Sequence, residues 1–379
     1  MRVVHVVHGK ANPDGHNGIS RVVYNLNKHQ RLIGSDSKIW AIVDGVRSRT
    51  TLVRDRFVSV ECFPRVRVPW RADIVDELIG NRDHIDLVHL HLIWFLDKNI
   101  ITAALRRAGI PVVVTTHGTY STAHAYTGKR RLARYAELSY LADATEVHAL
   151  TREEGTGLHR YGYDGPIYIA HNGVSMDEIP ATRSRTYFDG KSYRDRCKLL
   201  WVGVLRRDKN IGALIRAISM LPTATRKALM VVLVGPDYQG NAARFRAQAR
   251  DLGCEDSFDH IGPLYGQEKY DAIESADAYV MPSVTEGFSL SLLDAMACGK
   301  PTLVTSGCGM NYLADVAFNV RCEPYAQDIA FGISELLRRR DEWSTLGGNA
   351  LRIVKEKLSW TAAAEQHLKH YSRIVRGAE

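Results

Sequence analysis

Short apolar runs alternate with helical patterns along most of this 379-residue chain, and this alternation restricts the folds that it can adopt. The segment 19–34 carries apolar residues at roughly helical spacing, among them Val22, Val23 and Leu26. The apolar runs of the first half span residues 2–9, 85–94, 110–118, 144–150 and 165–174. Buried strands that alternate with helices indicate a parallel sheet with both faces covered. The sequence therefore predicts an α/β fold.

The same alternation restarts in the second half of the chain. A polar stretch at 183–196 separates the halves, and the length favours two domains of ordinary size. Strand-like runs then follow at 197–205, 228–236, 258–264, 276–283 and 300–306. We expect two doubly wound, Rossmann-like domains that face each other across a cleft, with the carboxyl ends of both sheets lining it. An amphipathic segment at 360–375 has no strand after it and can pack on either half.

The charge of the chain points to anionic partners. The net charge is +8, and basic residues gather at 65–73 and 128–135. Such an excess attracts nucleic acid, acidic lipid headgroups or phosphorylated substrates, although an ordinary solvated surface is the simpler interpretation of each cluster. Because the sequence has no helix-turn-helix, zinc-finger or RNP-type signature, we expect no nucleic-acid partner. A peripheral membrane contact through this basic surface of the N-terminal half remains open.

Cysteine usage and hydropathy set the expected location. The six cysteines are scattered without a CxxC pair or metal-ligand spacing, which is typical of reduced thiols in a cytosolic protein. No run approaches the roughly 20 apolar residues that cross a bilayer. We therefore expect a cytoplasmic protein, and the membrane contact left open above would be peripheral, on the cytoplasmic face.

Two acids in the stretch "SVTEGFSLSLLDAMACGKPTLVT" (283–305) carry the clearest chemical signal. Glu286 precedes a Gly-Phe turn, and Asp294 follows eight positions later inside a predicted helix whose amides suit phosphate or a sugar oxygen. Eight helical residues span roughly 12 Å. The acid pair of a glycosidase lies closer, at about 5 to 9.5 Å. The two carboxylates are thus better spaced to accept hydroxyl groups from the two ends of a long ligand than to flank one bond.

Other candidate residues follow predicted strands. Gly18 lies in a loop that leads into the first helix, where free backbone amides can meet an anion. His117 stands just past a buried strand, and Arg206 and Lys209 follow the first strand of the second half. The pair His89 and His91 shares one strand face without an evident third metal ligand, so we interpret both as structural.

The stretch "EGFSLSLLDAMACGKP" is similar to the acid-x7-acid signature of glycosyltransferase family 4, the retaining enzymes of GT-B fold. Further matches are "NGISRVVYNL", "THG", "IAHNGV", "ADAYVMPS" and the tail "LSWTAAAEQHLKHY". The resemblance covers nearly the whole length. It implies an N-terminal, acceptor-side domain over 1–178, a linker at 179–196 and a nucleotide-sugar-binding domain over 197–360, with a helix at 361–379 that returns to the first domain.

The resemblance also implies roles for individual residues. His117 would contact the transferred sugar, Glu286 would bind its hydroxyl groups and Asp294 would bind the ribose. The remaining donor-binding residues would be Gly18, Arg206, Lys209, Gly287, Phe288, Ser289 and Leu290. The arginine usual in the family falls on Val204, so Arg206 or Arg207 would substitute for it. The family usually has Gly-Gly where Asn17 and Gly18 stand, and its second signature acid is usually Glu.

The expected activity is that of a hexosyltransferase. It would transfer a sugar from a UDP- or GDP-sugar to a hydroxyl group of a glycan or lipid-linked acceptor, with retention and in cell-surface polysaccharide synthesis. We expect no cofactor and no metal, since no Asp-x-Asp site follows a strand. Two alternatives stay open: a catalytically silent subunit that binds a sugar-nucleotide or a membrane, and a sugar-nucleotide epimerase of the same fold.

Overall fold

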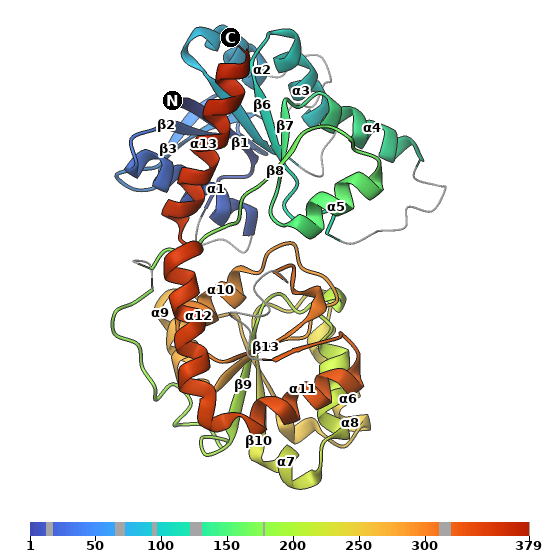
Figure 1. The fold of residues 1–379 in the computed structure, drawn as a ribbon. Coiled ribbons are helices and arrows are strands. Elements are labelled where there is room, and N and C mark those ends of the chain that lie inside the picture. The colour runs from blue at the N-terminus through green and yellow to red at the C-terminus, as the bar shows by residue number, and fades with distance from the viewer. Residues whose placement is uncertain are drawn as a thin grey trace. The chain divides into compact units, whose positions relative to one another are not determined.

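The structure, a computed structural model, describes residues 1–12, 18–64, 73–92, 97–121, 131–176, 179–310 and 320–378. The chain forms two compact units (Figure 1). The first comprises Met1–Gly173 and Trp360–Glu379, and the second comprises Val174–Ser359. The final helix thus belongs to the first unit, and the stretch 179–196 belongs to the second.

The first unit is an α/β domain with one large sheet. In chain order its elements are β1 (Arg2–His8), α1 (Gly18–Leu32), β2 (Asp36–Val43), β3 (Thr50–Val53), β4 (Ser59–Pro64), α2 (Asp73–Gly80), η1 (Arg82–His84), β5 (Leu87–His91), α3 (Asp97–Arg107), β6 (Val112–Thr115), α4 (Arg131–Ala142), β7 (Glu146–Ala149), α5 (Arg152–Tyr161), β8 (Ile167–Ile169) and α13 (Trp360–Ala378).

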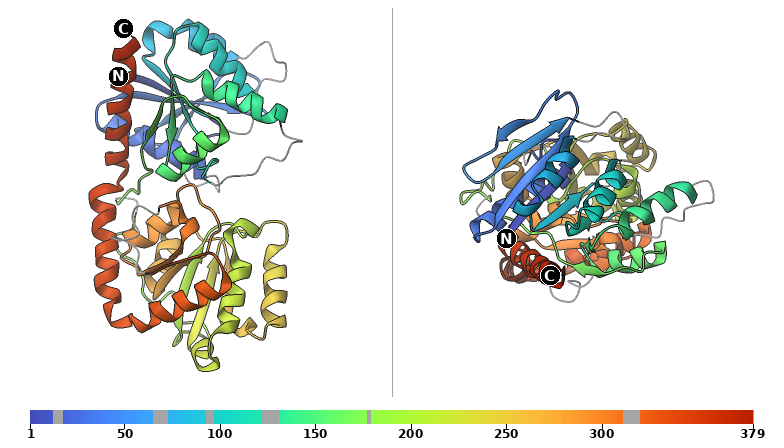
Figure 2. Two further views of the ribbon diagram at one scale, coloured as in Figure 1. Left: turned by 45° about the vertical axis from the view of Figure 1, so that its right-hand side comes forward. Right: turned by 90° about the horizontal axis from the view of Figure 1, so that it is seen from above.

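The eight strands of this sheet lie in the order β3-β4-β2-β1-β5-β6-β7-β8. All neighbours are parallel except the edge pair β3 and β4, so the predicted parallel sheet is confirmed. One face packs an apolar core that includes Val6, Leu90 and Val114. The other face is unusual, because the parallel register places His5 beside His89 on adjacent buried strands. Helices α1 and α13 contact each other along this unit (Figures 1 and 2).

The second unit repeats the architecture with a smaller sheet. Its elements are β9 (Cys197–Val202), η3 (Arg207–Lys209), α6 (Ile211–Met220), α7 (Thr223–Ala228), β10 (Leu229–Val234), α8 (Asn241–Asp251), η4 (Glu255–Ser257), β11 (Phe258–Gly262), α9 (Gly266–Ser275), β12 (Ala278–Met281), α10 (Leu290–Ala297), β13 (Thr302–Thr305), η5 (Ser306–Cys308), β14 (Val320–Cys322), α11 (Ala326–Arg338), η7 (Arg340–Glu342) and α12 (Trp343–Lys357).

The six parallel strands of the second unit lie in the order β11-β10-β9-β12-β13-β14. The chain adds β10 and β11 on one side of β9 and then adds β12 to β14 on the other. This change of direction creates a topological switch point between β9 and β12, where the loops that leave the two strands diverge. Open α/β sheets bind ligands at such a point.

The segment 179–196, which the resemblance predicts to be a linker, packs against the second unit. The Arg183 guanidinium lies 3.1 Å from a carboxylate oxygen of Glu274, and the Tyr193 hydroxyl donates to Asp259 at 2.6 Å. Phe188 is buried as well. These contacts hold the segment on α9 and β11.

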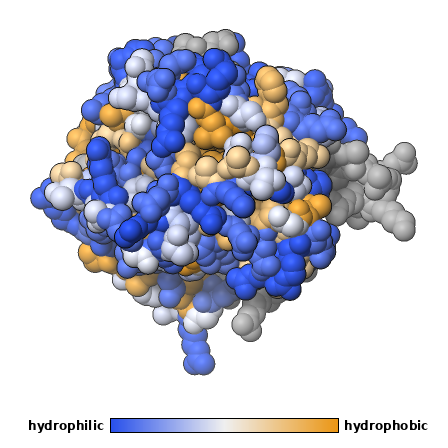
Figure 3. All heavy atoms as spheres, turned by 90° about the horizontal axis from the view of Figure 1, so that it is seen from below, coloured by the Kyte–Doolittle hydropathy of each residue, from blue (hydrophilic) through white to orange (hydrophobic). Residues whose placement is uncertain are grey.

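The surface shown in Figure 3 is mostly hydrophilic, with apolar side chains in small, separate groups. Among the described residues, no helix combines the length and the apolar character that crossing a membrane requires. The two basic clusters of the first half, at 65–73 and 128–135, lie partly outside the described residues, which omit 65–72 and 128–130.

Candidate functional site

Two predicted site residues lie at the switch point of the second unit. Lys209 ends the short helix η3 after β9, and Glu286 lies in the loop after the neighbouring strand β12. Asn210 ties these segments together, because its side-chain amide donates to the carbonyl oxygens of Pro282 and Pro324 at 2.9 Å each. The Val284 amide donates to the Asp208 carbonyl at 3.1 Å. The fold therefore brings Lys209 and Glu286 together from positions 77 residues apart.

Lys209 and Glu286 form an ion pair. The Lys209 ammonium lies 2.8 Å from each carboxylate oxygen of Glu286, and the Ser283 hydroxyl donates to the same carboxylate at 2.7 Å. The two side chains retain 19% and 13% of their exposure. Since both groups remain partly accessible, a ligand that carries negative charge and hydroxyl groups can compete for each of them.

Glycines hold the Glu286 loop against the neighbouring one. A Cβ atom on Gly309 would lie 2.4 Å from the Glu286 carbonyl oxygen, and one on Gly307 would lie 2.2 Å from the Val284 carbonyl oxygen. Gly309 also has a φ of +71°, which disfavours any side chain. The close approach of these backbones fixes the position of Glu286 above the sheet.

The predicted helix after Glu286 begins at Leu290, with Ser289 as its N-cap. The Ser289 hydroxyl accepts from the Leu292 amide at 3.3 Å, which satisfies one of the amides that a helix start leaves free. Phe288 is buried and Gly287 is partly exposed. Because Glu286 precedes α10, the estimate of 12 Å for a fully helical span to Asp294 is wrong. The intervening chain is part loop and part helix.

Asp294 lies deep in the second unit, with only 2% of its surface exposed. One carboxylate oxygen accepts from the Lys269 ammonium at 2.8 Å, and the other accepts from the Tyr270 hydroxyl at 3.1 Å. Sequence reasoning did not single out Lys269 or Tyr270. Their signal is weak because α9 reads as an ordinary amphipathic helix. A ribose that approaches Asp294 must share it with these two side chains.

Arg206 pairs with a nearby acid instead of extending freely. Its Nε donates to Asp208 at 3.0 Å, and this bond raises the pKa of the guanidinium. Burial of Asp208 acts to raise the pKa of its carboxyl group. The hydrogen bond from Arg206 and the charges of Lys209 and Arg206 outweigh this effect, so the pKa of Asp208 is lowered. Arg207 and Arg206 are both exposed, whereas Val204 is partly buried.

His117 belongs to the first unit, where it follows β6 in a four-residue turn. Its φ is +49°, a strained conformation for a residue with a side chain. The loop is held by α5: the buried Glu154 accepts from the Thr116 hydroxyl at 2.5 Å. A Cβ atom on Gly157 would lie 1.7 Å from the Tyr120 carbonyl oxygen, so the loop touches this helix.

Sequence reasoning missed the supporting role of Glu154. A signal was present, because Thr151 and Glu154 form a T-x-x-E pattern at the start of α5. Thr151 does cap the helix and accepts from the Glu154 amide. The Glu154 side chain instead accepts from the Leu150 amide at 2.8 Å and from Thr116.

Gly18 is the first residue of α1 and is exposed, with open space where a Cβ atom would lie. The preceding loop residues 13–17, including Asn17, lie outside the described residues. Ser20 occupies the first turn of the helix and is buried.

His89 and His91 have a neighbour that the sequence did not reveal. His5 comes from β1, and one ring nitrogen from each of the three lies within 4.8 Å of the others. Both nitrogens of each ring already have hydrogen-bond partners, however. His5 bonds Gln30 and His91, and His91 also bonds His117. A cation at this position would have to displace these bonds.

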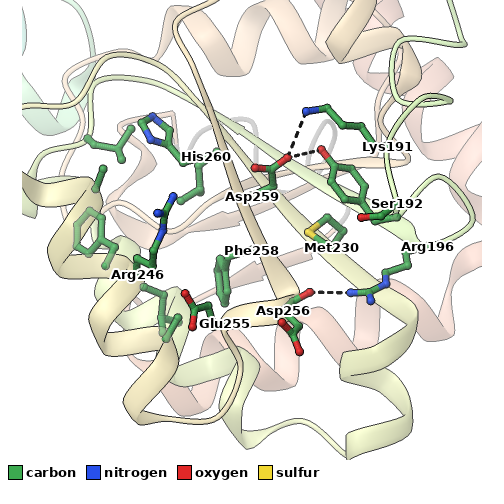
Figure 4. A pocket seen from close by; sticks show the side chains of 17 residues that line it. Lys191, Ser192, Arg196, Met230, Arg246, Glu255, Asp256, Phe258, Asp259 and His260 are labelled. Carbon is green, nitrogen blue, oxygen red and sulfur yellow. Dashed lines mark hydrogen bonds and ion pairs between the residues drawn. The ribbon is translucent and has the colours of Figure 1, made fainter.

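A cavity of about 550 Å³ lies elsewhere in the second unit, beside β10, β11 and α8 (Figure 4). Its charged side chains are largely paired: Lys191 lies 3.7 Å from Asp259, and Arg196 donates to the Asp256 carbonyl oxygen at 2.7 Å. None of the predicted donor-binding residues is among those that line it.

Two family models match the chain in succession. The model described as "Glycosyltransferase Family 4" matches residues 16–178, and the one described as "Glycosyl transferases group 1" matches residues 184–352. A curated relative, D-inositol 3-phosphate glycosyltransferase of Mycobacteroides abscessus, is 24% identical over 90% of this chain and 78% of its own. Another of that name, from Catenulispora acidiphila, is 27% identical over 79% of this chain and 73% of its own.

Solved structures share the fold over the whole length. Sucrose-phosphate synthase from Thermosynechococcus elongatus has a TM-score of 0.79 at 18% identity, with full coverage of both chains. Anabaena HepE in complex with UDP-glucose has a TM-score of 0.76 at 17% identity, covering 98% of this chain and 99% of its own. The predicted GT-B fold, with two Rossmann-like domains, is therefore confirmed.

Proposed function

Because this chain belongs to glycosyltransferase family 4 and is a glycosyltransferase, we propose that it transfers a sugar from a nucleoside-diphosphate donor to a hydroxyl group with retention of anomeric configuration. The observation that carries this proposal is the Lys209–Glu286 pair at the switch point of the second unit. An ammonium and a carboxylate in contact there match two neighbouring parts of a nucleoside-diphosphate-sugar donor: the diphosphate that leaves and the polyhydroxylated ring that is transferred.

Binding of the donor exchanges partners within this pair. The Lys209 ammonium moves from the carboxylate to the diphosphate, and the released carboxylate accepts hydrogen bonds from sugar hydroxyl groups. Ser283 keeps one carboxylate oxygen in place during the exchange, since it donates to Glu286 from the loop that follows β12. The amides of Phe288, Ser289 and Leu290 and the exposed Arg206 supply further donors for phosphate oxygens.

The reaction breaks the bond between the anomeric carbon and the diphosphate oxygen and forms one to the acceptor oxygen. The electron pair of the broken bond stays on the diphosphate. The proton of the acceptor hydroxyl passes to that leaving phosphate on the same face of the sugar. Lys209 and the helix amides stabilise the charge that develops there, so this chain's own groups suffice and we propose no metal. His117 contacts the transferred sugar.

The comparisons favour a UDP-sugar as donor, although a GDP-sugar is the other candidate. HepE was solved with UDP and with UDP-glucose. For the acceptor, we propose a glycan or lipid-linked hydroxyl group of a cell-surface polysaccharide, reached by peripheral contact of the basic first unit with the cytoplasmic face of the membrane. The names of the relatives make inositol phosphates an additional acceptor to test.

Calorimetry with UDP-glucose and GDP-mannose tests the donor site. We expect one of these nucleotide-sugars to bind, and Lys209→Ala to weaken its binding about 10- to 100-fold, because a charge-assisted contact contributes roughly 1.5–3 kcal/mol. Lys198→Ala is the matched control: this partly buried lysine pairs with Asp277 at the opposite end of β9. Equal affinities of wild type and Lys209→Ala would rule out the phosphate role.

A transfer assay with the bound donor and an acceptor panel tests the chemistry. Retention predicts an α-linked product from an α-linked donor. Glu286→Ala should abolish transfer while the protein stays folded. An altered free nucleotide-sugar formed without any acceptor would instead identify an epimerase.

A further inference from the structure

Four side chains of the first unit form a continuous row of hydrogen bonds that ends at His117. The Gln30 carbonyl oxygen lies 2.8 Å from Nε2 of His5, and Nδ1 of His5 lies 3.0 Å from Nε2 of His91. Nδ1 of His91 lies 3.1 Å from Nε2 of His117. Gln30, His5 and His91 are all buried, whereas His117 is partly exposed. The row therefore connects the core beneath the sheet to a residue at its functional edge.

With Oε1 of Gln30 facing His5, the neighbouring polar groups set the polarity of this end of the row. The Asn27 amide donates to the Ser37 hydroxyl at 2.9 Å, so the proton of that hydroxyl points elsewhere. It is directed to Oε1 of Gln30, at 2.7 Å. Oε1 of Gln30 is thus an acceptor, and the only group that can donate to it from His5 is an Nε2–H.

This polarity propagates through the imidazoles because a neutral ring carries one N–H. When Nε2 of His5 holds the proton, Nδ1 of His5 is an acceptor, and His91 must donate from its own Nε2. Nδ1 of His91 is then an acceptor, and His117 must donate from Nε2. Nδ1 of His117 then carries no proton, and its lone pair can accept a hydrogen bond.

The rings are neutral at ordinary pH. Burial lowers the pKa of His5 to about 4 and that of His117 to about 3, and it holds the pKa of His91 well below its usual range. A second proton on His5 or on His91 would set two N–H groups against each other. The row is therefore stable only with one proton on each of these two rings.

We propose that Gln30, His5 and His91 are positioning residues that hold His117 as the Nε2–H tautomer, so that its Nδ1 accepts a hydrogen bond from a hydroxyl group of the transferred sugar. The strained backbone of His117, with φ at +49°, agrees with a side chain held for a task. This inference rests on the proposed function, in which His117 contacts the transferred sugar. Gln30, His5 and His91 do not contact the sugar themselves.

Nitrogen NMR of the full-length protein with ¹⁵N-labelled histidine measures the tautomers directly. In the absence of any ligand, His5, His91 and His117 should each show a protonated Nε2 and an unprotonated Nδ1. Single substitutions assign the signals. A proton on Nδ1 of His117 in the wild type would overturn the proposal.

Gln30 variants test the direction of the row. Gln30→Glu keeps an acceptor facing His5 and should keep the tautomer of His117. Gln30→Met has a similar shape and no acceptor, so Nδ1–H should become populated at His117. A His117 spectrum that is the same in Gln30→Met as in the wild type would overturn the role of Gln30.

His91→Phe and His89→Phe form a matched pair on β5. Both remove a buried imidazole from the same strand face, but His89 bonds Thr115 and Tyr371 and lies outside the row. We expect His91→Phe to change the His117 spectrum and to lower kcat up to about 100-fold at similar donor KM, since small misplacements of a reacting contact have effects of that size. His89→Phe should leave the His117 tautomer and kcat as in the wild type.

Equal losses of kcat in these two variants, with an unchanged His117 spectrum, would reduce the row to a structural element and overturn the proposal. The spectra are recorded on the free protein and need no donor. If the spectra show the predicted tautomers but the protein transfers no sugar, the proposed function is overturned and the tautomer assignment of the row is kept.

Discussion

The first unit should unfold in mild acid while the second unit stays folded. All 15 histidines of the chain except His260 lie in the first unit. Among the described residues, burial lowers the pKa of a cluster on one side of its sheet to about 4 for His5 and to about 3 for His117 and His148. The full cluster is His5, His89, His91, His117, His148 and His367.

The sign follows from proton binding. Each histidine is neutral in the folded state but titrates at its ordinary pKa of 6.5 when unfolded, so the unfolded state binds more protons below that pH. Stability is therefore complete above about pH 6.5 and is lost as the pH falls toward the folded pKa values. Burial raises the pKa values of Glu154 and Glu146, and these two carboxyl groups act in the opposite direction but are fewer than the histidines.

The magnitude is large compared with ordinary domain stability. Between about pH 7.5 and pH 5.5, each such histidine lowers the free energy of unfolding by a little over ~1 kcal/mol, and six independent groups lower it by about 8 kcal/mol. Domains are stable by about 5–15 kcal/mol in total. With a urea dependence of about 2 kcal/mol per M, one histidine shifts the midpoint by roughly 0.7 M and the cluster shifts it by about 4 M.

Buried cysteines report on each unit separately. Cys62 is the one cysteine of the first unit, and Cys197 lies in β9 of the second. After equilibration in urea at each pH, a brief pulse with a thiosulfonate reagent labels only unfolded chains, and mass spectrometry reads each site. The Cys62 midpoint should fall steeply with pH while the Cys197 midpoint stays nearly constant. A constant Cys62 midpoint, or equal falls at both sites, would refute this reasoning.

Two further predictions concern packing around the site. Gly157→Ala should lower both the melting temperature and the rate of sugar transfer, because the added Cβ atom would lie 1.7 Å from the Tyr120 carbonyl oxygen in the His117 loop. Gly155→Ala serves as the control, since its Cβ atom would meet only a side-chain atom of another residue, at 3.9 Å. Equal melting temperatures and equal transfer rates of the two alanine variants would show that the contact between Gly157 and the His117 loop supports neither stability nor activity. Asp294→Asn should destabilise the second unit by about 3–5 kcal/mol in urea titrations, since it leaves the largely buried Lys269 ammonium without its counter-charge. A stability equal to that of wild type would show that the pair contributes nothing.

The sequence predicts most of the fold because parallel strands buried on both faces leave continuous apolar runs. Strands β1, β5 and β9 appear at the expected positions. Strands β2, β3 and β4 were not predicted. Strand β3 is the edge of the sheet and pairs antiparallel with β4, and exposed residues in both interrupt the apolar pattern.

The site residues that a local sequence pattern marks could be predicted. The contacts between them could not, because they depend on the tertiary fold. Glu286 stands out through the turn and helix that follow it. Its bond to Lys209 depends on the order of strands in the sheet, which no local pattern records. Likewise, His89 and His91 share a face by simple alternation, but His5 joins them only through the register of β1 against β5.

A crystal structure with a bound nucleoside-diphosphate-sugar tests the central claim most directly. We predict that a sugar hydroxyl group lies within hydrogen-bond distance of the Glu286 carboxylate, and that the Lys209 ammonium has left that carboxylate for a phosphate oxygen. A donor lodged in the cavity beside Asp259 and His260, with the Lys209–Glu286 ion pair intact, would contradict the account.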